Sequence, residues 1–259
     1  MKRTILDAQL REISMKIVAL GTLVETALSQ ALQAVRSGEQ ALCGLVIESD
    51  ETINTLRSEL EEQAFRSLTL QQPLGGRDLR FLSSVIPIAA DLERMGDNAK
   101  GVAQLLLRMI PVRAAGMSEI QIDPSVAVDR KQKGASGQAL TEETIISELL
   151  DLGQEALRVL QGTMQAFKKS DADAARAIWQ EDDVVDVRYA LVRHDLMTML
   201  SGIHAISALQ QDALIMQRLT YWLWIAHNLE RVADHCTNIC ERTVFFIEGD
   251  TIIKASEAE

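Results

Sequence analysis

A stretch near the C-terminus of this 259-residue chain places acidic side chains at helical spacing. On an α-helix each residue turns the side-chain direction by about 100°, so positions four and seven residues apart share a face. One narrow face then carries three carboxylates, an imidazole and an amide, which belong to His227, Glu230, Asp234, Asn238 and Glu241. This face has no Lys or Arg, and like charges one helical turn apart repel each other. A group of opposite charge should therefore lie against it.

A second acidic pair, Asp182 and Asp186, has the same four-residue spacing. Packing its helix against the helix of residues 227–241 would surround a cation with oxygen ligands from both sides. Carboxylates with an occasional imidazole suit Mg, Mn or Fe, and Zn less exclusively. The alternative interpretation is an acidic helix face that is simply solvated. Cys236 and Cys240 are also one turn apart, but they lie on the apolar side, where the sequence favours small core residues over metal ligands.

Long helices must position these side chains, and the sequence predicts six of them. Helix-forming residues dominate the chain, which has only 4 prolines and 14 glycines. Apolar periodicity and the Gly and Pro positions predict helices at about 6–37, 39–70 and 78–109. A fourth helix should open at Thr141, with acidic residues in its first turn, and a fifth at residues 169–171. The sixth should span about 211–248.

The two halves of the chain resemble each other on either side of a predicted linker. Residues 50–54 match residues 182–186, and residues 92–97 match residues 229–234, which is typical of a tandem repeat. Residues 111–140 lose the apolar periodicity and contain several breakers. We therefore expect an all-α fold of two tandem antiparallel three-helix bundles. The first repeat should cover residues 1–110, the linker 111–140 and the second repeat 141–259.

Composition excludes several classes of function. A net charge of −11 argues against a nucleic-acid-binding protein, which needs a concentrated basic surface. The N-terminus gains acids at Asp7 and Glu12 before any apolar stretch, unlike a secretory signal. Residues 196–211 are too few and too polar to span a membrane. Three cysteines form an odd count that fits reduced thiols. We expect a cytoplasmic protein that meets membranes only through its partners.

Catalysis has little support in the sequence. A carboxylate-bridged metalloenzyme would carry Glu-x-x-His motifs on two helices. The residues three positions before the four histidines are instead Leu191, Ser201, Trp224 and Val232. No Walker-type phosphate loop is present, and no nucleophile, base and orienting group are recognisable together. We therefore expect no enzymatic activity, with the metalloenzyme and a purely structural helical adaptor as the alternatives.

Two copies of one motif resemble the PhoU family. The first begins with Leu70-Gln71-Gln72-Pro73 and continues to Ala89-Ala90-Asp91-Leu92-Glu93-Arg94-Met95-Gly96-Asp97-Asn98. The second runs from Asn228-Leu229-Glu230-Arg231-Val232-Ala233-Asp234-His235 to Asn238-Ile239-Cys240-Glu241. The resemblance covers nearly the whole chain except the linker and implies two three-helix bundles. In some members it also implies multinuclear iron or zinc clusters on the acidic stripes, whereas other members are isolated without metal.

The resemblance further implies a place beside the Pst phosphate ABC transporter. There the family contacts the transporter ATPase PstB and the sensor kinase PhoR, and it represses the phosphate-starvation response when phosphate is plentiful. We expect the same partners for this chain, together with a homodimer. The function expected is thus that of an adaptor that ties phosphate uptake to phosphate signalling.

Candidate metal ligands follow when the family's acidic stripes are carried over residue by residue. They are Asp50, Glu93 and Asp97 in the first half and Asp182, Asp186, Glu230 and Asp234 in the second, and the acidic face of residues 227–241 adds Glu241. The first half departs from the pattern, because neutral Asn54, Gly101 and Gln104 stand where the second half has Asp186, Asn238 and Glu241. Lys100 would neutralise the first stripe further. Since fewer anionic ligands attract a cation less strongly, we expect metal chiefly at the second-half stripe.

Overall fold

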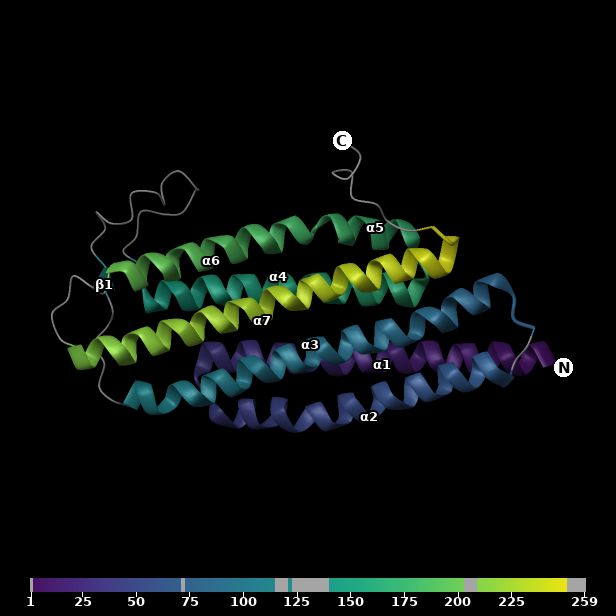
Figure 1. Cartoon of the computed structure of the whole chain (residues 1–259), viewed down its shortest axis with the longest axis horizontal. Coiled ribbons are helices and arrows are strands. Elements are labelled where there is room, and N and C mark those ends of the chain that lie inside the picture. The colour runs from purple at the N-terminus through teal and green to yellow at the C-terminus, as the bar shows by residue number, and fades with distance from the viewer. Residues whose placement is uncertain (1, 71–72, 115–120, 123–139, 203–208, 251–259) are drawn as a thin grey trace.

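The computed structural model describes residues 2–70, 73–114, 121–122, 140–202 and 209–250. Seven helices lie along the length of the molecule (Figure 1): α1 Lys2–Ser37, α2 Gln40–Leu70, α3 Gly76–Ala114, α4 Glu142–Lys169, α5 Ala172–Gln180, α6 Asp182–Gly202 and α7 Leu209–Glu248. Two short strands, β1 Gln121–Ile122 and β2 Leu140–Thr141, pair antiparallel. Helices α1 to α3 pack on one another, and so do α4 to α7. The expected all-α fold of two three-helix units is confirmed.

The predicted fifth helix consists of α5 and α6, which meet at Glu181. The Glu181 N–H donates to the Ile178 carbonyl, and the Val184 N–H donates to the Glu181 carbonyl. Both bonds span three residues, so the chain tightens for one turn without leaving its helical course. Arg158 of α4 forms an ion pair of 2.6 Å with the Glu181 carboxylate. No Gly or Pro marks this break, which is why the sequence indicated one continuous helix.

The boundaries of α4 follow the predicted local signals. Thr141 forms a capping box with Thr144, in which its hydroxyl accepts from the Thr144 N–H and its own N–H is satisfied in return. At the other end Ser170 adopts a left-handed conformation with φ 52°, and its N–H donates to the Ala166 and Phe167 carbonyls in the last turn of the helix. Asp171 then caps α5 by accepting from the Ala174 N–H. Capping residues thus fix both ends of the turn between α4 and α5.

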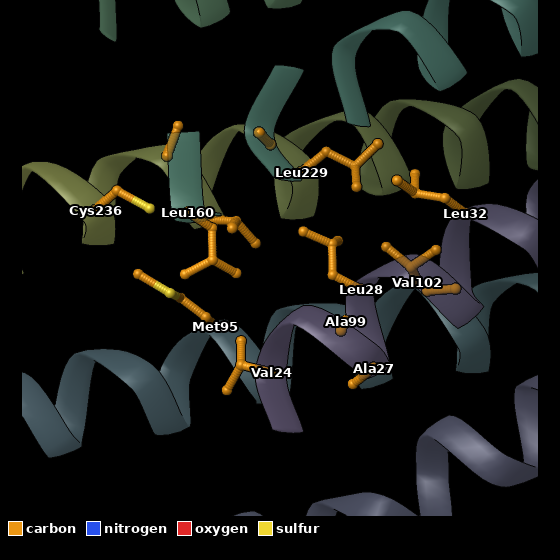
Figure 2. Close-up of a cluster of buried hydrophobic side chains, with 14 of the residues drawn as sticks. Val24, Ala27, Leu28, Leu32, Met95, Ala99, Val102, Leu160, Leu229 and Cys236 are labelled. Atoms are coloured by element: carbon orange, nitrogen blue, oxygen red, sulfur yellow. The ribbon is translucent and has the colours of Figure 1, made fainter. Parts of the chain in front are cut away.

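One continuous apolar core joins the two repeats. Figure 2 shows Val24 and Leu28 of α1 meeting Met95 of α3, Leu160 of α4 and Leu229 of α7, and all of these side chains are buried. Contacts between α3 and α7 are the most extensive between any two elements that the structure describes, and α1 also packs on α4. Each bundle therefore completes its core with a helix of the other bundle.

The predicted linker is structured at both of its ends. Helix α3 continues to Ala114, beyond the expected end of the first repeat, and Leu140 is buried in the common core. The segments 115–120 and 123–139 lie outside the described residues. The division into repeats at 1–110 and 141–259 stays a prediction.

Helix α1 is the one described helix that is long and apolar enough, over Ile5–Ser37, to meet the length and composition criteria of a membrane span. Half of its most apolar window is buried inside the fold. Ile17, Leu20 and Val24 are fully covered by the other helices. Burial within the protein therefore accounts for its apolar character.

A buried polar contact crosses the interface between α3 and α7. Nδ1 of His235 lies 3.0 Å from Oδ1 of Asp91, and both residues are 6% exposed. The Asn238 amide donates to the same Asp91 oxygen over 3.4 Å. When the two repeats are aligned, Asn228 of α7 matches Asp91 of α3, and Gly101 of α3 matches Asn238 of α7. A Cβ at Gly101 would lie 2.8 Å from Oδ1 of Asn228. The pair Asn228 and Gly101 therefore forms a second close approach between α3 and α7, in which the glycine makes room for the amide.

Replacing His235 by Ala should destabilise the protein by about 2 kcal/mol, because Asp91 would lose its main partner inside the core. The matched control is Asn98→Ala at the equivalent position of the first repeat, where the amide nitrogen is buried without a hydrogen-bond partner. Urea unfolding should show a clearly smaller loss for the control. Equal losses would show that the Asp91–His235 contact does not hold the interface.

Candidate functional site

Three carboxylates of the second repeat converge where α6 passes alongside α7. Asp182 and Asp186 belong to the first two turns of α6, and Asp234 projects from α7. One oxygen from each lies within 4.8 Å of the others, and no other set of Asp, Glu, His or Cys side chains in the described parts of the chain meets this condition. Asp186 and Asp234 are exposed, whereas Asp182 is half-buried. We call these three residues the aspartate triad.

Burial and neighbouring carboxylates make the charged forms of Asp234 and Glu230 less favourable at the triad. Burial and the charge of Asp186 raise the pKa of Asp234, against smaller opposing effects of His235 and Arg231. Burial and the charge of Asp234 likewise raise the pKa of Glu230, whose carboxylate lies 3.2 Å from Nδ1 of His227. These carboxyl groups thus take up protons more readily than they would in water. A cation bound among them would relieve the same repulsion.

Two other side chains of the predicted acidic face have separate partners. Glu241 accepts a hydrogen bond of 3.2 Å from the indole nitrogen of Trp179 on α5. Asn238 turns towards α3 and Asp91. The face of α7 is therefore divided among α5, α6 and α3. Sequence reasoning missed the role of Trp179 because nothing in the spacing of α7 indicates which residue of another helix lies opposite Glu241.

The first repeat has its acidic residues at the equivalent place between α2 and α3, but a lysine lies among them. Nζ of Lys100 is 2.6 Å from Oδ2 of Asp50, and the Asn54 amide donates to that same oxygen over 3.1 Å. Burial raises the pKa of Glu93 and of Asp97, with further increases from neighbouring carboxylates. The hydrogen bond to Asp50 raises the pKa of Lys100 and keeps its ammonium group charged. We call Asp50, Glu93 and Asp97 the first-half cluster.

Comparison with known proteins gives each repeat the same match. The PhoU domain model matches residues 17–106 and again residues 149–243, which together make up most of the chain. The chain belongs to the PhoU family. All eight candidate ligands lie within the two matched PhoU domains.

PhoU proteins of two bacteria match over nearly their full length. A phosphate-specific transport system accessory protein PhoU homolog of Streptococcus pneumoniae is 30% identical over 246 residues, covering 95% of this chain and 96% of the relative. The crystal structure of the phosphate transport system regulatory protein PhoU from the same species covers 96% of this chain at 28% identity, with a TM-score of 0.70. The crystal structure of PhoU from Pseudomonas aeruginosa covers 94% at 26% identity, with a TM-score of 0.73. The resemblance seen in the sequence is thereby confirmed.

Substituting Asn for Asp234 should stabilise the metal-free PhoU chain at neutral pH. The raised pKa of Asp234 means that its charged form opposes folding. The stability that the protonated form contributes is complete below the unfolded pKa and is lost as pH rises through the folded value. At pH 7 in chelator the melting temperature should therefore rise by about 2 °C, and the gain should shrink as pH falls towards 4.

Asp151→Asn is the control for this substitution, because Asp151 is exposed on α4. It should change the melting temperature little at either pH. A lower melting temperature for Asp234→Asn at pH 7 would contradict the electrostatic description of the triad.

Proposed function

We propose that this PhoU chain is a cytoplasmic accessory regulator that couples phosphate uptake to phosphate-starvation signalling. The observation that carries the proposal is the pair of PhoU domains, which share their order and nearly their full length with proteins named as phosphate-specific transport accessory or regulatory proteins. The partners we propose are the ATPase of a Pst-type transporter and a PhoR-like sensor kinase. A homodimer would present each docking surface twice.

The proposed role is adaptor rather than enzyme. Cys43, Cys236 and Cys240 are all buried. Burial raises the pKa of each thiol, to about 11 for Cys240, so they are poor nucleophiles at neutral pH. The exposed surface instead offers large apolar side chains beside the triad, such as Val187, which is 71% exposed on α6. Such side chains suit contact with another protein.

Deleting the gene in its own host should raise expression of phosphate-starvation genes in phosphate-rich medium. A regulator that represses this response when phosphate is plentiful cannot be removed without releasing it. A reporter fused to a starvation promoter measures the change, and the intact gene on a plasmid serves as the control. If the reporter stayed repressed while phosphate uptake was intact, the regulatory assignment would be wrong.

We also propose that the aspartate triad binds a metal ion. Its donors are all carboxylate oxygens, which suit iron, Mn or Mg and also accept Zn. The PhoU resemblance favours iron or zinc among these. Glu230 and His227 lie near enough to contribute to the charge of the site. A metal-free, purely structural adaptor is the alternative that metal analysis separates from this proposal.

The double variant Asp186→Asn with Asp234→Asn should lose most of the metal bound per chain, since two of the three converging carboxylates become neutral. The matched variant Glu93→Gln with Asp97→Asn removes two charges from the equivalent place in the first repeat and should keep the metal. Elemental analysis of untagged protein purified without chelator measures both. Equal losses, or a larger loss from the first-repeat pair, would contradict the assignment of the metal to the triad.

A further inference from the structure

The first-half cluster already contains a cation supplied by the chain itself. Lys100 lies one turn after Asp97 on α3, and its ammonium group reaches across to α2, where it contacts Oδ2 of Asp50 over 2.6 Å. Asp50 is 7% exposed, and a carboxylate so deeply buried needs a partner of opposite charge. Lys100 is that partner.

The contacts of Asp50 leave little room for a metal ion. Its Oδ2 accepts from Lys100 and also from the Asn54 amide over 3.1 Å, so one of the two oxygens has its hydrogen-bonding capacity taken up. Any divalent ion that bound the remaining oxygens would lie close to an ammonium group of like charge. The first-half cluster also lacks the close convergence of ligand atoms that distinguishes the triad among the described residues.

The second repeat differs at both of these places. Thr237 stands where the first repeat has Lys100, and its hydroxyl donates to the Asp234 backbone carbonyl over 2.6 Å. Asp186 stands where the first repeat has Asn54, and it belongs to the triad. The second repeat therefore has a carboxylate in place of the Asn54 amide and a neutral hydroxyl in place of the Lys100 ammonium group.

We propose that Lys100 occupies the first-half cluster as a built-in cation and excludes divalent metal ions from it. The ammonium group stabilises the contact between α2 and α3 whether or not metal is available, whereas a bound metal would do so only when available. The first-half cluster is thus a latent metal site that the lysine keeps closed. The proposal concerns this cluster alone and does not depend on whether the triad binds metal.

The test uses full-length protein in which the triad is removed by Asp182→Asn, Asp186→Asn and Asp234→Asn. In this background Lys100→Met should lower the melting temperature in chelator, because the buried Asp50 loses its cation. Adding Mn²⁺ should restore it, and calorimetric titration should show Mn²⁺ binding at least tenfold tighter than with Lys100 present. The background with Lys100 intact should show no Mn²⁺-dependent rise in melting temperature.

Two controls make the result specific to the cluster. Lys16→Met breaks the more exposed pair Lys16–Glu59 at 3.0 Å, which lies outside the first-half cluster, and should create no Mn²⁺ binding. Adding Asp97→Asn to the Lys100→Met chain should abolish the gain. If Lys100→Met fails to fold, Lys100→Gln keeps a hydrogen-bond donor and removes only the charge. Mn²⁺ binding that needs Asp50 while Lys100 is present, or no gain in affinity after its removal, would overturn the proposal.

Discussion

The packing of α3 against α7 is the constraint on which the rest of the structure depends. The two helices run antiparallel (Figure 1), and each closes the core of the other repeat. Leu92, Met95 and Ala99 of α3 and Leu229, Val232 and Cys236 of α7 are all fully or almost fully buried. On each helix the candidate metal ligands occupy the other side, so Glu93 and Asp97 turn towards α2, and Glu230 and Asp234 towards α6. One interface thereby places both carboxylate groups on the outer seams of the molecule.

Duplication explains why the two seams look alike, and divergence explains why their chemistry differs. In both repeats the charged form of a buried or half-buried carboxylate is unfavourable, and a positive charge beside it must offset this electrostatic cost. The first repeat relieves it with Lys100, whereas at the aspartate triad we propose that an ion from solution does so. Gly101 shows the same divergence at the interface, because it makes room for Asn228 where the other copy has the amide of Asn238.

Much of this architecture could be predicted from local sequence signals. Periodicity gave the helices and the shared face of Asp182 and Asp186, and the Thr141 cap gave the start of α4, since these depend on residues within a few turns. Periodicity does not reveal which helix of another repeat lies opposite a face. The Asp91–His235 contact joins residues 144 positions apart, and the burial of Leu140 depends on the same long-range packing. The contact between Lys100 and Asp50, which lie 50 positions apart, likewise could not be predicted from the sequence.

Together the two proposals make the equivalent seams of this PhoU chain a metal site and a lysine-neutralised site. Anomalous diffraction from crystals soaked in Mn²⁺ tests this assignment most directly, because it locates every bound ion without relying on a variant. We expect an anomalous peak between Asp182, Asp186 and Asp234, and none between Asp50, Glu93 and Asp97, with Lys100 still in contact with Asp50. A peak in the first-half cluster, or none at the triad, would contradict this assignment.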